Sequence, residues 1–473
     1  MRRALLLTAA CAALAGCTLE PAYVRPTPAV PSSWPVGEAY APATEAPAAA
    51  LSYRDVFRDP QLLALIDRAL ANNQDLAAAM ANVEIARAQY HVQRADELPH
   101  IDARASADET HSRTPTTAGK NNTARSYSAD VGFSAFELDL FGRLRSLTHA
   151  AQQEYLASEA GAGAARLALV GEVADAFLAL ATDRSLLAIA RDTQASAQRT
   201  VELTQARLSG GVAPGSDLAQ AQTLLAQAQS DLASLTTDVA QDRNALQLLV
   251  GAPVADAELP ASIEAVDGLL TEVPAGLDSR ILLGRPDVAE AEHRLRAANA
   301  QIGAARANFF PTISLTALAG VASPELAHLF SGTNANWQGS AAASLPLFAG
   351  GANVANLAQA KGERDLAVAN YQKAIQTAFR EVADALARRG TIKDQLAAQT
   401  MLETAADRSY SLNVARYKEG VDPYLTTLDS QRTLYSARRS LASTRLIQAQ
   451  NLVALYQSLG GDQLLQRQVV AKR

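Results

Sequence analysis

The chain has 473 residues, of which 48% are apolar, so its length and composition exclude a disordered protein and allow two or three ordinary domains. Aromatic residues make up only 5%, and much of the apolar content is alanine, which favours long, closely packed helices over one thick core. The formal net charge of −6 comes without a basic stripe interleaved with aromatic residues, which argues against a nucleic-acid partner.

The N-terminus has the pattern of a secretory signal. Arg2 and Arg3 precede the apolar run 4–13, which is too short to remain as a membrane span. The following Leu-Ala-Gly-Cys resembles the bacterial lipoprotein box, which implies that Cys17 becomes the lipid-modified first residue; an ordinary signal peptide ending near a cysteine is the alternative. Because Cys11 lies in the removed segment, one cysteine is left, too few for a disulfide or a Cys-based metal site.

Beyond the signal, the chain changes from proline-rich to helical. Residues 18–60 are rich in proline, which disfavours helix and predicts an extended arm or a disordered spacer. From Pro60 apolar residues recur at three- and four-residue spacing, and the stretches 141–213 and 347–422 contain no proline. A helix over residues 147–208 alone would span roughly 90 Å at 1.5 Å per residue. Such lengths predict a coiled coil, a helical repeat or a tube wall.

Apolar residues, most of them leucine, recur at a seven-residue period in the segment that comes after each long helix. This period keeps one seam turned towards a partner helix and favours a left-handed supercoil, so we interpret these residues as a core stripe. They are Leu218, Leu225, Leu232, Val239 and Leu246 in the first half, and Leu434, Leu441 and Leu455 in the second.

The sequence repeats itself. EVADAF begins at Glu172 and EVADAL at Glu381, an offset of 209. Glycine, proline and arginine positions near the turns match at the same offset, so two copies of one unit of about 200 residues are predicted. The further matches include Arg207 with Arg416, Gly211 with Gly420, Val212 with Val421, Pro214 with Pro423 and Gln222 with Gln431.

Each copy also contains two segments in which apolar and polar residues alternate, the period of a strand. They cover about 100–110 and 125–139 in the first copy, and about 311–322 and 336–347 in the second. Two-faced strands of about ten residues are typical of a transmembrane barrel, and a half-buried soluble sheet is the alternative. Four strands cannot close a barrel around water, so several chains must contribute to one barrel.

These residues resemble the TolC-like outer-membrane factor family, in its lipoprotein branch that serves multidrug efflux. The resemblance is carried by segments along nearly the whole mature chain: CTLEPAYVRP, FRDPQLLALIDRALANNQDL, FELDLFGRLRS, GRPDVAEAE, SLPLFAGG and ARYKEGVDPYLTTLDSQRTLYSA. The family usually has a second arginine where this chain has Gly284, a departure at a structural turn.

The resemblance implies a mainly α fold with a small transmembrane β-barrel. Three chains would build a twelve-strand barrel in the outer membrane and a long α-helical tube in the periplasm. The implied homotrimer is a passive, lipid-anchored conduit, without catalytic residues, cofactor or metal. A periplasmic adaptor and an inner-membrane pump would supply small molecules for export. Export of proteins, as in type I secretion, stays open within the family.

The implied layout has six parts. They are a signal peptide (1–16), an anchored extended arm (17–60), a first repeat (61–251), a connecting equatorial segment (252–286), a second repeat (287–460) and a C-terminal tail (461–473).

The turns between the long and shorter helices are the candidate site. Each places a glycine where a helix ends and a proline where the next begins. Asp422 is a good N-cap residue, with Ser216 or Asp217 in the first copy. The resemblance adds a role for both tips as adaptor-docking surfaces, formed by Gly211, Val212, Asp217, Gly420, Val421 and Asp422.

The same resemblance implies a periplasmic gate in the second copy. Arg416 and Tyr417 match the family's Arg-Tyr pair, which would hydrogen-bond across to neighbouring helices and hold the closed state. Asp429 would point into the bore, where three copies would form a negative constriction. A solvated aspartate on a helix face is the alternative. The first copy has Arg207-Leu208 and Gln220 at these positions.

Two other classes of protein fit the sequence less well. An enzyme finds little support, because the six histidines are scattered, no HExxH occurs, and GAGAAR at 161–166 lacks the strand and third glycine of a dinucleotide loop. A periplasmic coiled-coil lipoprotein without a pore is the second rival, against which the four alternating strands argue.

Overall fold

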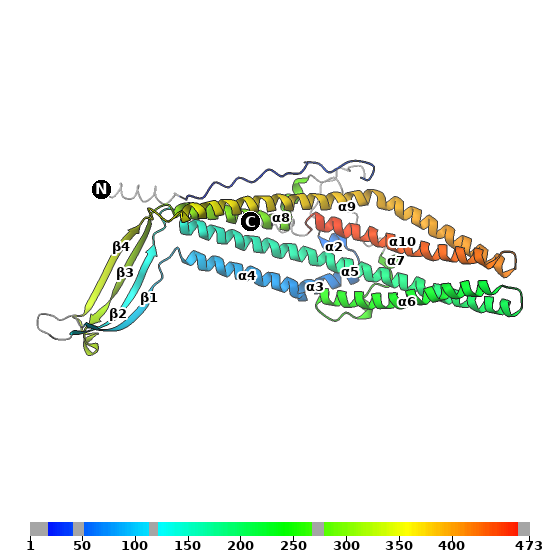
Figure 1. Cartoon of the computed structure of the whole chain (residues 1–473), viewed down its shortest axis with the longest axis horizontal. Helices are drawn as coiled ribbons and strands as arrows, with labels where there is room; N and C mark the ends of the chain where they lie inside the picture. The colour runs from blue at the N-terminus through cyan, green and yellow to red at the C-terminus, as the bar shows by residue number, and fades with distance from the viewer. Residues whose placement is uncertain (1–17, 41–51, 113–121, 267–278, 462–473) are drawn as a thin grey trace. The chain divides into compact units, whose positions relative to one another are not determined.

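The computed structural model describes residues 18–40, 52–112, 122–266 and 279–461 (Figure 1). The predicted signal peptide and the lipid site at Cys17 lie outside these residues. Within them the protein is mainly helical with one small sheet, the predicted fold class. The α-helices are α2 (Tyr53–Val56), α3 (Pro60–Asn72), α4 (Gln74–Ala95), α5 (Arg143–Ser209), α6 (Gly215–Val250), α7 (Ile263–Val266), α8 (Pro286–Ala307), α9 (Ala352–Lys418) and α10 (Tyr424–Ser458).

Short 3-10 helices and four strands complete the described chain. The 3-10 helices are η1 (Asp256–Glu258), η2 (Ser279–Gly284) and η3 (Leu326–His328), and the strands are β1 (Asp102–Ser112), β2 (Asn122–Glu137), β3 (Thr312–Ser323) and β4 (Ala335–Ser344). The helix α2 lies inside the segment predicted as an extended arm. None of the helices within the described ranges is both long and apolar enough to cross a membrane.

The chain forms two compact units. The first contains Met1–Thr27, Asn82–Glu159 and Glu290–Tyr371, and the second contains Pro28–Ala81, Ala160–Ala289 and Gln372–Arg473. Helices α4, α5, α8 and α9 contribute residues to both.

The first unit contains the sheet, in which the four strands pair antiparallel in the order β1-β2-β3-β4 (Figure 1). Two central glycines let β2 and β3 approach closely, because a Cβ on Gly132 would lie 2.0 Å from the Ala317 carbonyl oxygen, and one on Gly320 would lie 2.2 Å from that of Ala129. Near Ala135, whose φ is 55°, the register shifts, which is the signature of a bulge. Among the residues that the structure describes, no strand of the same chain pairs with the outer edge of β1 or of β4.

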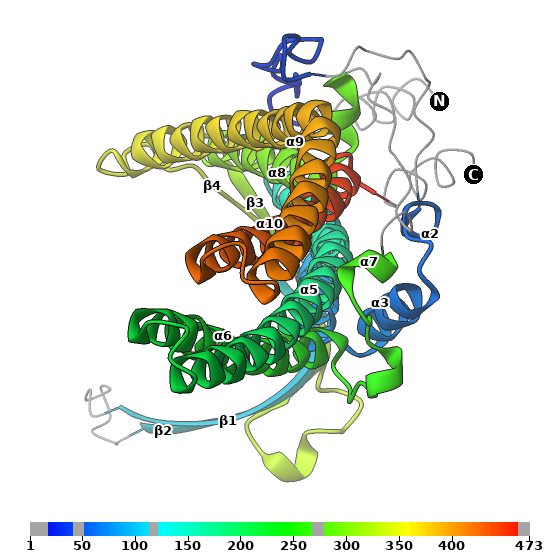
Figure 2. The ribbon, with the colours of Figure 1, turned by 90° about the vertical axis from the view of Figure 1, so that its right-hand side faces the viewer.

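The second unit contains two antiparallel helix pairs, α5 with α6 and α9 with α10, which lie side by side (Figures 1 and 2). The repeated hexapeptide is in their core, as the spacing predicts: Val173, Phe177, Val382 and Leu386 are all buried. The heptad leucines of α10 are buried too, whereas Leu225, Leu232 and Val239 of α6 are half-buried and pack at the border of small apolar clusters. The two copies therefore bury the same apolar positions of the hexapeptide, but Leu225 and Leu232 of α6 are less buried than their equivalents Leu434 and Leu441 of α10.

The two copies differ at the aspartate of the hexapeptide. Asp175 has a carboxylate oxygen that is buried without a hydrogen-bond partner in the described chain, whereas Asp384, its equivalent, is exposed. Burial, with the charge of Glu172 adding to it, raises the pKa of Asp175 from 3.8 to about 6. The folded protein therefore binds this proton more tightly than the unfolded chain does, and stability is lost as the pH rises through this window.

Asp175→Asn is expected to raise the melting temperature at about pH 8, where the buried carboxylate is charged, and to leave it unchanged below the ordinary aspartate range. Thermal unfolding of the purified protein at both pH values measures this difference. Asp384→Asn is the matched control, because the same change on an exposed side chain should alter neither value. Equal melting temperatures for Asp175→Asn and the wild type at about pH 8 would contradict the assignment.

Candidate functional site

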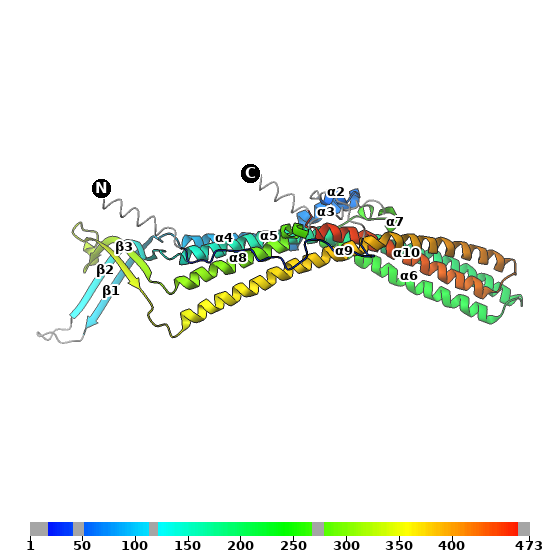
Figure 3. The same cartoon turned by 90° about the horizontal axis from the view of Figure 1, so that it is seen from above.

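The two turns between the paired helices have the same backbone structure, and both lie at one end of the second unit (Figure 3). Gly211 and Gly420 adopt left-handed φ values of 73° and 75°. Nothing lies within 4 Å of the position that a Cβ would take at either glycine, so the turn needs glycine for its backbone and not for space. The same two hydrogen bonds close each turn: Val212 N–H to Arg207 O (2.9 Å) with Gly211 N–H to Leu208 O (3.0 Å), and Val421 N–H to Arg416 O (2.9 Å) with Gly420 N–H to Tyr417 O (3.0 Å).

Each turn also exposes a large apolar side chain. Val212 is 67% exposed and Val421 is 61% exposed, and Leu425, at the start of α10, is exposed as well. Apolar side chains at the tip of a helical hairpin are suited to contact with another protein.

The predicted N-caps are wrong. The residues before the second helices, Pro214 and Pro423, occupy the N-cap positions, and neither cap has a side-chain hydrogen bond. Asp422 instead accepts two hydrogen bonds from the Arg416 guanidinium, from Nε at 2.5 Å and Nη2 at 3.0 Å. This contact lowers the pKa of Asp422. Helix α10 begins one residue later than its predicted N-cap required, whereas α6 begins earlier, at Gly215, before the predicted caps Ser216 and Asp217. Asp422 is therefore free to bind Arg416, which lies in the last turn of α9.

Tyr417 is buried between the two helix pairs. Its ring lies 5.5 Å from that of Tyr424, and the Arg207 guanidinium of α5 lies 4.7 Å from its centre. Arg207 Nη1 also donates to the Tyr417 carbonyl oxygen at 3.0 Å. The Tyr417 hydroxyl is buried without a partner in the described chain. Within one chain, the link to the neighbouring helix therefore comes from Arg207 and the Tyr417 ring, and not from the predicted Arg416 and Tyr417 side-chain hydrogen bonds.

Asp429 lies on the exposed face of α10. Its repeat equivalent Gln220 is half-buried on α6, with an amide oxygen that has no partner in the described chain. Sequence reasoning missed Arg207 and Tyr424 as neighbours of Tyr417. The signals were present, because Arg207 is the repeat equivalent of Arg416, and Tyr424 directly follows the turn proline.

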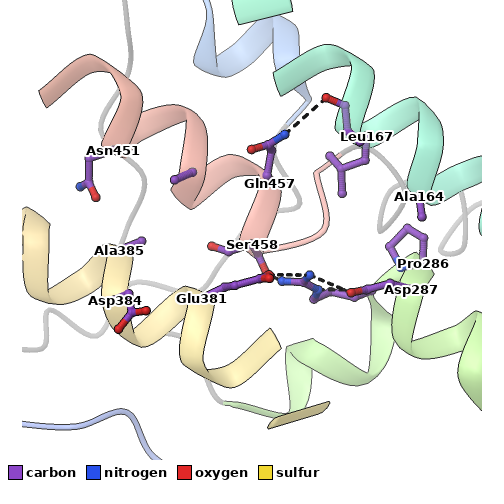
Figure 4. A pocket seen from close by; sticks show the side chains of 13 residues that line it. Ala164, Leu167, Pro286, Asp287, Glu381, Asp384, Ala385, Asn451, Gln457 and Ser458 are labelled. Atoms are coloured by element: carbon purple, nitrogen blue, oxygen red, sulfur yellow. Dashed lines mark hydrogen bonds and ion pairs between the residues drawn. The ribbon is translucent and has the colours of Figure 1, made fainter. Parts of the chain in front are cut away.

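A second polar centre lies where α8 begins. Arg285, 7% exposed, donates to both carboxylate oxygens of Asp287, to Glu381 at 2.8 Å, and to the Ser458 carbonyl oxygen at the end of α10 at 2.8 Å (Figure 4). Burial lowers the pKa of Arg285, but the bonds and charges of the two carboxylates outweigh it, so the net shift is upward. A cavity of about 580 Å³ adjoins this centre, lined also by Leu167. Arg285 therefore joins three helices, a role that the sequence did not indicate.

The N-terminal arm has a defined seat in the first unit. Arg25 binds Glu292 of α8 through two hydrogen bonds, at 3.0 and 2.8 Å. The carbonyl oxygen of Leu19 accepts from Arg306 at 3.1 Å, and that of Pro21 accepts from Asn299 at 2.7 Å. The arm is thus held along α8 by hydrogen bonds to both its side chains and its backbone.

The family follows from comparison with known proteins. A family model described as outer membrane efflux protein matches residues 65–252 and 277–461. The chain belongs to the outer membrane efflux protein family. The two matched segments correspond to the two repeats inferred from the sequence.

Similar proteins cover nearly the whole length of this family member. The toluene efflux pump outer membrane protein TtgC of Pseudomonas putida is 44% identical over 453 residues, which cover 95% of this chain and 93% of TtgC. The outer membrane protein OprJ of Pseudomonas aeruginosa is 40% identical over 449 residues, covering 95% and 93%. The open-state MtrE outer membrane channel of Neisseria gonorrhoeae superposes with a TM-score of 0.81 at 36% identity, covering 94% of this chain and 98% of that one. The protein is therefore an outer-membrane efflux channel component.

Proposed function

We propose that three copies of the chain form a passive conduit that exports small toxic molecules from the periplasm to the exterior. The observation that carries this proposal is the four-stranded sheet with two open edges, β1 and β4. An exposed sheet edge offers unpaired backbone donors and acceptors, and a lipid environment requires each of them to be satisfied. Pairing β1 of one copy with β4 of the next satisfies both edges, and three copies bring the total to about twelve strands, enough to enclose water.

The partners follow from the same proposal. Val212 and Val421 with their neighbours Gly211, Asp217, Gly420 and Asp422 form the docking surface for a periplasmic adaptor, which connects the conduit to an energised inner-membrane pump. The channel itself carries out no catalysis and needs no cofactor. The relative TtgC is described as a toluene efflux pump protein, which supports small apolar compounds as the exported class.

The gate and the anchor complete the proposal. Tyr417 holds the helix tips together with Arg207, Arg416 holds the turn through Asp422, and Asp429 from three copies forms a negative ring in the bore. Cys17 carries the lipid that anchors the arm in the outer membrane. Palmitate labelling that persists in Cys17→Ser would contradict the anchor.

Cysteine cross-linking across the sheet edges tests the conduit. A cysteine at Ala103, Ala105 or Ala107 of β1, combined with Ala341→Cys in β4, is expected to yield covalent dimers and trimers on oxidation. The control combines Ala129→Cys of β2 with Ala341→Cys, because β2 is a central strand and its neighbours are β1 and β3 of the same chain. Planar-bilayer recordings of the same preparations would measure conductance. A monomer that shows no edge cross-links and forms no pore would refute the proposal.

A further inference from the structure

A chain of four hydrogen-bonded side chains connects the start of the N-terminal arm to α8 through α5. Both carboxylate oxygens of Glu20 lie 3.0 Å from His149 Nδ1 on α5. His149 Nε2 lies 3.2 Å from Gln153 Nε2, and Gln153 Oε1 lies 2.8 Å from His293 Nδ1 on α8. Gln153 is 7% exposed, so its amide depends on these two rings for its hydrogen bonds.

With the Gln153 amide oriented as it is in the structure, these contacts fit one protonation state of the two rings. A carboxylate can only accept, so His149 Nδ1 carries a proton and donates to Glu20. The amide nitrogen of Gln153 can only donate, so His149 Nε2 is the acceptor and the ring is neutral. The amide oxygen then accepts from His293 Nδ1. The arrangement is complete only while His149 has a single proton.

A second proton on His149 changes the hydrogen bond between His149 and Gln153 and the one between Gln153 and His293. A protonated Nε2 cannot face the Gln153 amide nitrogen, so the buried amide must rotate and present its oxygen. The amide nitrogen then faces His293 Nδ1 and needs an acceptor there, which requires the proton of that ring to be on Nε2. The tautomer of His293 is thereby tied to the charge of His149.

The N-terminal arm packs closely against α8 at Glu20, the first of the four hydrogen-bonded side chains. Gly303 of α8 lies directly beneath Glu20, because a Cβ on Gly303 would lie 2.8 Å from Glu20 Cα and 2.6 Å from the Ser146 hydroxyl oxygen. Leu19 and Pro21, on either side of Glu20, are held by the backbone hydrogen bonds described above. A change in the strength of the Glu20 contact therefore acts on a part of the arm that is held on both sides.

We infer that Glu20, His149, Gln153 and His293 form a proton-dependent latch, in which protonation of His149 tightens the seat of the N-terminal arm and rotates the Gln153 amide. The neutral pair is a hydrogen bond, whereas the protonated pair is an ion pair with charge-assisted hydrogen bonds, which are stronger. The arm is therefore held more firmly in acid than in weakly alkaline solution.

The surrounding charges agree with this direction. The hydrogen bond to Glu20 raises the pKa of His149, and it outweighs burial and the positive charge of Arg296 on α8, both of which lower it. Glu20 comes from the arm, and His293 is the titratable neighbour on α8. Because the pKa is raised in the folded state, the added stability is complete below the pKa of an unfolded histidine and is lost as the pH rises through the higher folded value.

The mobility of a nitroxide label on the arm tests the latch in the full-length trimer. Val24 is 80% exposed, so Val24→Cys can carry the label without entering the seat. Electron paramagnetic resonance spectra between about pH 5 and pH 8 span the histidine range and should show a less mobile label in acid. Exchange of the imidazole C2 protons with deuterium, followed by mass spectrometry, reports the titration of His149 itself.

Three variants separate the latch from other pH effects. His149→Gln should abolish the pH dependence of label mobility, whereas His100→Gln, a change at an exposed histidine in the same unit, should leave it intact. Gln153→Ala should keep the pH response of the label but uncouple His293 from His149. Labelled protein without Val24→Cys gives the background. A label whose mobility is independent of pH, or a His149→Gln protein that responds as the wild type does, would overturn the inference.

Discussion

Tyr417→Ala is expected to raise single-channel conductance in planar bilayers several-fold, because Tyr417 belongs to the proposed gate. The Tyr417 ring is 5% exposed and fills the space between Arg207 of α5 and Tyr424 of α10. Removing a buried aromatic ring costs about 3 kcal/mol of packing energy, and here the loss falls on the contact that joins the two helix pairs. Helices that are no longer joined at the tips can separate.

Tyr417→Phe is the matched control for this experiment. It removes only the hydroxyl, which has no partner in the described chain, and keeps the ring and the Arg207 contact. We therefore expect Tyr417→Phe to conduct as the wild type does, because an unpaired buried hydroxyl contributes no stability. A Tyr417→Phe channel as open as Tyr417→Ala would show that the hydroxyl binds a neighbouring copy in the proposed trimer.

Arg285→Ala is expected to lower the free energy of unfolding by about 3 kcal/mol, the lower end of the range for removing one partner of a buried ion pair. The change leaves Asp287, Glu381 and the Ser458 carbonyl oxygen without their shared donor. The two carboxylates are 41% and 40% exposed, so water can reach them and moderates the loss. The midpoint of denaturant unfolding of the detergent-solubilised protein measures the effect.

Two further variants serve as controls for Arg285→Ala. Arg364→Ala removes an arginine of α9 that pairs with the exposed Asp365, and it should change stability by no more than about 0.5 kcal/mol. Arg285→Lys should recover only part of the loss, because an ammonium group cannot hold Asp287 with two parallel hydrogen bonds. Equal unfolding midpoints for Arg285→Ala and Arg364→Ala would show that Arg285 does not stabilise the junction of the three helices.

The length and pairing of the elements could be predicted from local sequence. Long stretches without proline become α5 and α9, each of 67 residues, because nothing in them interrupts the helical hydrogen-bond ladder. Alternating residues become β1 to β4, since a period of two presents one apolar face. The match between Gly211 and Gly420 correctly indicated equivalent turns, because a left-handed residue at a helix end favours glycine wherever it occurs.

The candidate site could be predicted only in part. The sequence indicates roles for Arg416 and Asp422, but it does not indicate their contact with one another. N-cap rules consider the residues at the start of one helix and leave out the side chains at the end of the preceding helix. Arg207 and Tyr417 are 210 residues apart in the chain, and no local pattern reports that they meet. Glu20 and His149 are 129 residues apart, and the same reason applies.

Two repeated helical hairpins, four strands and glycine turns follow from local sequence, because each depends on neighbouring residues and on the period of their polarity. The contacts of the repeated positions depend instead on the packing of distant segments. Glu172 of the first hexapeptide is exposed, whereas Glu381 of the second binds Arg285, and Asp175 is half-buried with one buried carboxylate oxygen where Asp384 is exposed. Identical residues acquire different roles because ion pairing and burial depend on side chains that other, distant segments bring to them.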